Sequence, residues 1–420
     1  MFSPPKYRTP NSRARIATPS TSSLPSLPAD RDILEGLLPS HVSTVTKPSA
    51  SANADEKKIQ VKDLKYVGSY NWVESQKPTI IVPGSPPEWR NKATPYKVDP
   101  DSGVVFADQN GFRSPNAILL PLVRAVDMND ADFDWSAIDF VTDRNGLRKL
   151  LRWIGKPDPK EFRIDTQLAG KRTILFNRWE KRTREAVGGM NYSTYGFSFE
   201  KSSTKPAGDC EESTGHHRIV KYDFGGLNMV VRFEVDACFP QPTTKRQMAS
   251  KSQSDDHVDA LTDAMSKFSL SSASGSKVQT HEDNYGLRIR QAGSYVPQSH
   301  IIELTTVSMG RRANFDWSEA YPQLFLSQTP HHFLAVHTRG RFNTVEQRKL
   351  GSPDLSQVDK TAQTALWKLR QALGVIKDIV VEHGKTGRLS LVCQKGEMKV
   401  YERSSDVSCL PEDILKRFET

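Results

Sequence analysis

The chain has 420 residues, of which 36% are hydrophobic and 25% charged, so it carries enough apolar residues for a substantial core. No apolar run approaches the roughly 20 residues that cross a bilayer, and we therefore expect no membrane association. The formal net charge of +9 favours a polyanionic partner such as nucleic acid, although a generally basic protein would show it too.

The cysteines and the N-terminus bear on the compartment. Four cysteines are scattered along the chain without a CxxC pair, which argues against a disulfide scaffold and a zinc ribbon and fits a reducing compartment. Basic residues precede the first acidic residue, Asp30, as in a mitochondrial presequence, but six prolines in the same stretch oppose the amphipathic helix that such a presequence needs. We expect the nucleus or the cytoplasm, with the nucleus favoured and the mitochondrion a weaker alternative.

Composition divides the chain into segments. Residues 1–60 are rich in Ser, Pro, Thr and Ala, which predicts a disordered basic tail. A second low-complexity stretch at about 241–284 lies between two strand candidates, so we interpret it as a disordered surface insertion. Between the termini we expect one domain over residues 61–402, followed by a C-terminal tail over residues 403–420.

Periodicity within that domain alternates between helix and strand. Apolar residues at three- and four-residue spacing predict a helix that ends at Ile154, before Gly155. Residues 162–179 are typical of two strands with a turn at Ala169-Gly170. A long helix is expected over residues 362–380, followed by a strand pair over 389–401. This mixed order predicts an α+β fold with a central, largely antiparallel sheet flanked by helices.

The segment from Met229 to Phe239 is the most informative strand candidate. Alternate side chains of a strand point to opposite faces, so Arg232, Glu234 and Asp236 share one face and apolar residues the other. Two carboxylates two residues apart lie roughly 6.5–7 Å apart, a spacing at which both can reach one divalent ion or a close pair of ions. The alternative is an exposed sheet face on which Arg232 bridges the two carboxylates.

Two further segments place carboxylates among apolar residues. Glu303 lies in a predicted strand from His300 to Val307, and Glu200 ends a stretch from Tyr195 in which aromatic and polar residues alternate. Hard cations such as Mg²⁺ prefer carboxylate and main-chain oxygens. Such an ion assists phosphodiester or pyrophosphate cleavage by activating water and neutralising the leaving oxygen.

In this order the segments resemble those of the DXO family of RNA 5′-end decapping enzymes and exoribonucleases. The matching stretches are IDFVTDRNGLRKLL (residues 138–151), GFSFE (196–200), EVD (234–236), IELT (302–305) and QLFLSQTP (323–330). The resemblance covers about residues 60–400, and its motifs are short but occur in the family's order.

The resemblance implies a nuclease-like core related to the PD-(D/E)XK fold and a hydrolase that acts on RNA 5′ ends. Its substrates would be incompletely capped, triphosphorylated or NAD-capped RNA, with possible 5′–3′ exonuclease activity. It places Arg144 on a phosphate and Gln323 in the active site. It also implies a Mg²⁺ or Mn²⁺ site whose ligands are Glu200, Glu234, Asp236, Glu303 and the carbonyl of Leu304.

One departure from the family pattern concerns catalysis. The family's fourth motif has a lysine two residues after its glutamate, whereas this chain has Thr305, whose hydroxyl brings no positive charge. Arg232, on the predicted face of Glu234, could direct a guanidinium toward the substrate instead, or could simply pair with a neighbouring carboxylate. The second functional hypothesis is therefore a catalytically impaired relative that binds RNA or is the partner of a 5′–3′ exoribonuclease.

Two other patterns carry less weight. The pairs His216-His217 and His331-His332 lack the spacing of a zinc site, so we interpret them as exposed or satisfied histidines. Basic residues between Lys171 and Arg184 lie near two aromatic residues, and could track an RNA backbone or form an ordinary basic surface.

Overall fold

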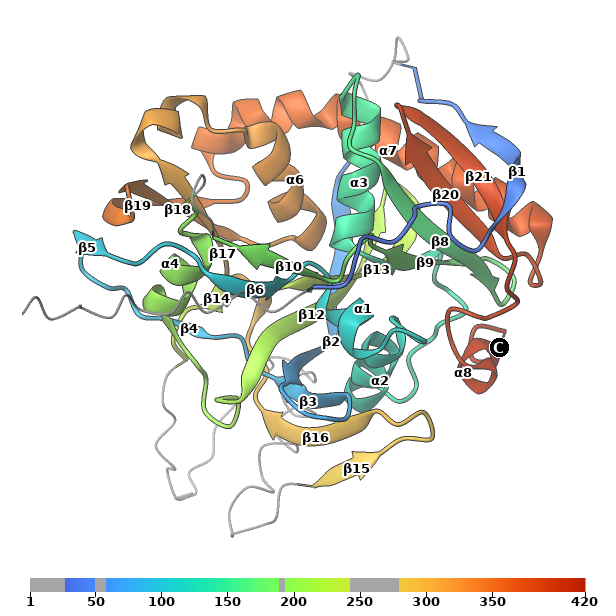
Figure 1. The fold of residues 1–420 in the computed structure, drawn as a ribbon, viewed down its shortest axis with the longest axis horizontal. Coiled ribbons are helices and arrows are strands. Elements are labelled where there is room, and N and C mark those ends of the chain that lie inside the picture. Colours follow the sequence, from blue (N-terminus) through green and yellow to red (C-terminus); the bar gives the residue numbers. More distant parts are fainter. Residues whose placement is uncertain (1–26, 50–57, 189–192, 242–278, 420) are drawn as a thin grey trace, which may run out of the picture.

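The computed structural model describes residues 27–49, 58–188, 193–241 and 279–419 (Figure 1). In this part of the chain, two large β-sheets and one two-stranded sheet are flanked by helices. The first sheet has twelve strands, which lie in the order β1 (Leu37–Val45), β21 (Glu397–Arg403), β20 (Leu389–Gln394), β8 (Phe162–Ala169), β9 (Thr173–Trp179), β7 (Phe140–Asp143), β13 (Asn228–Glu234), β12 (Ser213–Phe224), β2 (Val61–Val73), β3 (Thr79–Gly84), β16 (Arg288–Gly293) and β15 (Thr280–Glu282).

The second sheet has seven strands and shares the centre of the molecule with the first. Its order is β11 (Thr204–Lys205), β4 (Glu88–Trp89), β14 (Ala237–Cys238), β17 (Ile301–Ser308), β18 (His331–Thr338), β19 (Arg341–Lys349) and β5 (Tyr96–Lys97). The two-stranded sheet consists of β10 (Arg184–Val187) and β6 (Gly103–Phe106). Most neighbouring strands are antiparallel, but β13–β7, β7–β9, β16–β3, β17–β18 and β14–β4 are parallel.

Helices cover the sheets on several sides (Figure 1). The α-helices are α1 (Gln109–Arg113), α2 (Leu120–Asn129), α3 (Arg144–Gly155), α4 (Gly196–Ser203), α6 (Trp317–Ser327), α7 (Ser356–His383) and α8 (Glu412–Lys416). Short 3₁₀ turns occur at η1 (Gln298–His300), η2 (Met309–Asn314) and η3 (Pro353–Leu355). No helix among the described residues is long and apolar enough to span a bilayer.

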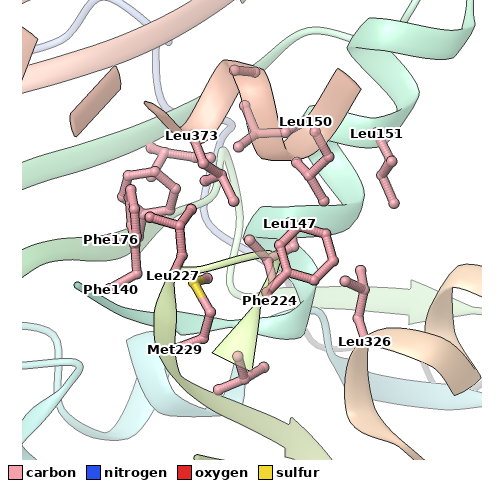
Figure 2. Packing of buried hydrophobic residues seen from close by; sticks show 14 of the residues in the cluster. Phe140, Leu147, Leu150, Leu151, Phe176, Phe224, Leu227, Met229, Leu326 and Leu373 are labelled. Atoms are coloured by element: carbon pink, nitrogen blue, oxygen red, sulfur yellow. The ribbon is translucent and has the colours of Figure 1, made fainter. Parts of the chain in front are cut away.

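Strand β13 is apolar along most of its length because both of its faces are covered. Met229 and Val231 belong to a buried cluster that contains residues of α3 and α7, and Figure 2 shows Met229 with Leu147 and Leu373 of these helices. Val230, on the other face, packs against a second cluster that contains residues of α2 and α8. A strand buried on both faces shows a nearly continuous apolar run, so a charged residue within it needs a partner.

Several predictions from the sequence are confirmed. The predicted helix before Gly155 is α3, the hairpin over residues 162–179 is β8–β9, the long helix is α7, and the last strand pair is β20–β21. The predicted α+β class is also confirmed, although the strands form two large sheets instead of a single central one.

Other predictions are wrong in this structure. Part of the predicted N-terminal tail forms β1, which pairs with the edge strand β21 and buries Val45. The predicted C-terminal tail contains α8, which buries Ile414 and Leu415. A few apolar residues suffice in both places because an existing sheet edge or core supplies the other half of the contact. Most of the predicted insertion, residues 242–278, lies outside the described residues.

Candidate active site

The carboxylates of the EVD motif lie where the chain passes from one sheet to the other. The predicted single strand ends at Glu234, and the chain resumes in the other sheet as β14, which pairs with β17. At the junction the Val235 N–H donates to the carbonyl of His216, 3.0 Å away. The Leu304 N–H, on β17, donates to Oδ2 of Asp236 at 2.8 Å. The break therefore fixes one carboxylate to each sheet.

Arg144 and Glu303 form an ion pair beside this junction. Arg144 is the first residue of α3 and follows β7, the parallel neighbour of β13. Its Nη1 lies 2.7 Å from Oε2 of Glu303, and its Nη2 lies 3.5 Å from Oε1. Its guanidinium also lies 5.7 Å from the centre of the Phe233 ring. This places the arginine against the strand that carries Glu234.

Glu200 reaches the cluster from α4, so the stretch in which aromatic and polar residues alternate is a helix. The two phenylalanines on either side of Ser198 differ in environment, since Phe197 is 50% exposed and Phe199 is fully buried. That difference is typical of a helix, in which residues two apart point to different sides. Asp101, which the sequence analysis missed, accepts the Ser198 N–H at 2.8 Å, while its Oδ2 is buried without a hydrogen-bond partner.

Three of the four carboxylates, Glu200, Glu234 and Asp236, have raised pKa values. Burial raises the pKa of Glu200 to about 8, with further contributions from Glu234, Glu303 and Asp101. Burial, then Glu303 and Glu200, raise the pKa of Asp236 well above its ordinary range, against the opposing hydrogen bond from Leu304. Such mutual repulsion operates only over short distances, so the structure brings the four predicted carboxylates into one site.

Glu234 differs from the others in its access to solvent. Burial raises its pKa, while Arg144 and then Arg178 oppose the rise. Its side chain nevertheless remains accessible to solvent, which lets water or a small cation reach it. Arg178, which the sequence analysis placed in a basic patch, is held on β9 by Glu180, 2.7 Å from its Nε.

The donor set suits a hard divalent cation. Among the described residues, the carboxylates of Glu200 and Glu234 form no hydrogen bond and no salt bridge, so their oxygens are available. A cation would also reverse the repulsion that raises the pKa values. Within the described ranges, however, no three acidic, histidine or cysteine side chains already lie in a metal-binding arrangement.

Arg232 does not join this cluster. Its Nε and Nη2 donate to the two oxygens of Asp143 at 2.6 and 3.0 Å, and its Nη1 donates to the Tyr70 hydroxyl and the Ile118 carbonyl. The side chain is 1% exposed. The predicted role of Arg232 on the substrate is therefore not supported, and the alternative of a structural partner fits, with Asp143 as the neighbouring carboxylate.

Two other predicted residues lie close to the cluster. Gln323 is half-buried in α6, and its main-chain carbonyl accepts a hydrogen bond from the Ser327 hydroxyl. The same hydroxyl oxygen lies 3.4 Å from Nη1 of Arg144. Leu304 contacts the cluster through its N–H, which binds Asp236.

Thr305, where the DXO resemblance leads one to expect a lysine, belongs to an uncharged pair. Oγ1 of Thr305 shares a 3.1 Å hydrogen bond with Nε2 of His332, on the parallel neighbour β18. Burial lowers the pKa of His332 to about 4, so the imidazole is neutral near pH 7. The imidazole is buried and its Nδ1 has no hydrogen-bond partner, so the interpretation of this histidine as exposed or satisfied is wrong.

The basic patch between Lys171 and Arg184 is largely paired in the structure. Arg172 binds Asp139, Lys181 binds Glu161, and Arg182 binds Asp30, with separations of 2.5–3.0 Å. Paired surface cations are weaker candidates for a nucleic-acid track than unpaired ones. The ordinary basic surface is therefore the better interpretation.

The comparisons with known proteins concern the whole described fold. The model of the domain of unknown function DUF8563 matches residues 42–419, and no curated protein matches the chain. Rai1 of Scheffersomyces stipitis, solved in complex with (3′-NADP)⁺ and calcium ion, has a TM-score of 0.50 and 12% identity, over 91% of this chain and 95% of that one. Dxo1 of K. lactis, solved in complex with manganese, has a TM-score of 0.50 and 11% identity, over 88% and 96%.

These likenesses show the fold, and they confirm the predicted DXO resemblance at that level. The family model covers most of the chain, and the chain therefore belongs to the DUF8563 family.

Proposed function

We propose that this member of the DUF8563 family is a divalent-metal-dependent hydrolase that acts on the 5′ ends of RNA. Its substrates would be incompletely capped, triphosphorylated or NAD-capped RNA, with 5′–3′ exonuclease activity as an extension. The observation that carries the proposal is the assembly of Glu200, Glu234, Asp236 and Glu303, from separate parts of the chain, beside Arg144. The (3′-NADP)⁺, calcium and manganese in the two similar structures support the proposed ligand classes.

The chain's own residues divide the work. The four carboxylates and the main chain of Leu304 would hold Mg²⁺ or Mn²⁺, which when bound acts as a Lewis acid and lowers the pKa of water. The planar fork of Arg144 can hold two phosphate oxygens, and Gln323 would position the substrate from α6. Glu200, with its pKa near 8, keeps a proton at neutral pH without a cation and releases it when a cation binds.

A second function rests on Thr305. The uncharged Thr305–His332 pair supplies no positive charge at the position where the DXO family has a lysine. Charge stabilisation of that kind is worth about 3–4 kcal/mol of barrier. The alternative is therefore a catalytically impaired protein that binds RNA 5′ ends or is the partner of a 5′–3′ exoribonuclease. Localisation in the nucleus stays a prediction.

Hydrolysis and binding assays separate the two functions. Purified protein and Glu234→Ala are incubated with triphosphorylated, NAD-capped and monophosphorylated RNA in the presence of Mn²⁺. Product from the wild type alone supports the enzyme. Bound RNA without product from either protein supports the alternative, and absence of both binding and product contradicts both.

A further inference from the structure

A row of basic side chains leads away from the acidic cluster along one side of α3. Arg144, Arg148 and Arg152 are four residues apart on α3, which places each about 6 Å further along the helix axis, and Lys156 follows directly after the last residue of the helix. Their side chains become steadily more accessible, with exposed fractions of 11%, 17%, 33% and 45%. We call these four residues the α3 ladder. It begins at the ion pair with Glu303 and ends in solvent.

The α3 ladder carries more positive charge than its partners neutralise. Beyond Arg144, its three cations all turn to Glu319 on α6, with separations of 3.6, 2.8 and 2.5 Å. Arg148 lies within electrostatic reach of both Glu303 and Glu319. Three positive charges beyond Arg144 thus pair with one carboxylate, which leaves a surplus of two at this end of the row, where an anion would be stabilised.

The ladder forms one wall of a cavity of about 300 Å³ between α3, α6 and α7, which lie next to one another in Figure 1. Arg148, Arg152 and Lys156 line its basic side. Trp317 and apolar residues of α7, including Ala362 and Ala365, line its apolar side, and Glu319 of α6 also lies in the wall. The volume is at the lower end of the range for small-ligand sites. It suits a single planar group better than a peptide helix, which requires a long groove.

We propose that this cavity binds one nucleotide unit of the RNA chain downstream of the reacting 5′ end. Its phosphate pairs with Arg148 and Arg152, and its base occupies the apolar part of the cavity beside Trp317. Arginine suits phosphate because its fork is planar, and an aromatic wall accepts any base without regard to sequence. The assignment to RNA rests on the proposed function, whereas the nucleotide chemistry rests on the cavity itself.

RNA binding as a function of chain length tests the proposal. A Glu234→Gln background prevents hydrolysis, and fluorescence anisotropy measures the affinity for 5′-phosphorylated oligouridylates of increasing length. We expect affinity to rise once the RNA reaches the cavity and Arg152→Gln/Lys156→Gln to abolish that rise. The slope of log affinity against log salt should fall by about 0.7, because the contact of Arg152 with one phosphate of a single strand is lost.

The matched control removes the same charge elsewhere. Arg288→Gln/Arg290→Gln, on β16, also eliminates two ion-paired cations, with exposed fractions of 43% and 24%, and should leave both length dependence and salt slope unchanged. Ala362→Leu fills part of the cavity without a change of charge. It should lower the affinity for long RNA and leave the slope of log affinity against log salt unchanged. Thermal unfolding shows whether each variant is folded.

The outcomes separate RNA from a free nucleotide or a protein partner as the occupant of the cavity, and they separate this inference from the proposed function. Equal binding of long RNA by the wild type, the double variant and Ala362→Leu overturns the inference and leaves the cavity to a protein partner. Uridine monophosphate that binds the cavity without displacing long RNA also overturns it, in favour of a free nucleotide. Length-dependent binding without any hydrolysis by the wild type contradicts the proposed function and leaves this inference standing.

Discussion

Asp143 and Arg144 are neighbours in the chain, yet they belong to charged clusters of opposite kinds. Asp143 is paired with Arg232 in a closed network, in which one carboxylate meets one guanidinium and neutral donors and acceptors fill the remaining positions. Arg144 joins a cluster in which carboxylates outnumber the arginine, and two of these carboxylates have no hydrogen-bond partner in the described part of the chain. The first arrangement is complete without a ligand. The second lacks positive charge, and this deficit identifies it as the site.

Removal of one arginine from each cluster gives the largest expected difference. Arg232→Ala leaves the buried carboxylate of Asp143 unpaired and should lower the free energy of unfolding by about 3–5 kcal/mol. Arg144→Ala increases the repulsion among the site carboxylates, which a bound cation can relieve. Urea unfolding with and without Mn²⁺ measures both. We expect Mn²⁺ to restore stability to Arg144→Ala alone, and recovery of Arg232→Ala as well would contradict the distinction.

Asp236→Asn tests the acidic cluster directly. It removes one negative charge but keeps an oxygen that can accept the Leu304 N–H, so the fold should be retained. We expect metal affinity, measured by calorimetry with Mn²⁺, to fall strongly and RNA 5′-end hydrolysis to fall by about 100- to 1000-fold. Unchanged metal binding by a folded variant would count against the site.

Thr305→Lys adds a positive charge to the cluster of Arg144 and the site carboxylates. If the proposed hydrolase is limited by missing charge, the substitution should raise kcat by about 100-fold. Thr305→Met is the matched control, because it has a long side chain without charge and also breaks the hydrogen bond to His332. An equal response of both variants would show that charge is not the limiting factor.

The pH dependence of the metal-free protein is the smallest expected effect. The folded pKa of Glu200 is raised from 4.5 to about 8, so the folded state keeps a proton that the unfolded chain releases. Stability is therefore expected to fall as pH rises from about 4.5 to 8. Urea unfolding in EDTA should show a shallower decline in Glu200→Gln, and an identical profile would contradict the raised pKa.

Local sequence patterns predicted the helices and strands better than the side-chain contacts between them. Carboxylates within the apolar stretches around Glu234 and Glu303 revealed the site, because only a function or a specific partner keeps such groups there. The partner of Arg232 could not be predicted, because Asp143 lies on another strand and only the parallel register of β7 with β13 brings the two together. The unsatisfied His332 was missed for the same reason.

The remaining errors concern choices that tertiary contacts make. The alternation of aromatic and polar residues before Glu200 did not define its element, and contacts of Phe199 with Trp89, Tyr96 and Phe342 are made from a helix. The strand that carries Glu234 ends five residues before Phe239, where the strand candidate ended, because Asp236 accepts a hydrogen bond from the other sheet. The α3 ladder was visible in the sequence as evenly spaced basic residues, but its surplus charge appears only once Glu319 is placed beside it.

The passage of the chain between the sheets at Val235 also makes the site a sensor of their alignment. Glu234 moves with the twelve-stranded sheet, whereas Asp236 is tied to β17 of the seven-stranded sheet. Any sliding of one sheet past the other separates these two carboxylates before either sheet has to come apart. Warming or mild denaturant should thus abolish metal binding before global unfolding. A ligand that bridges the two carboxylates should stabilise the twelve-stranded and seven-stranded sheets against separation.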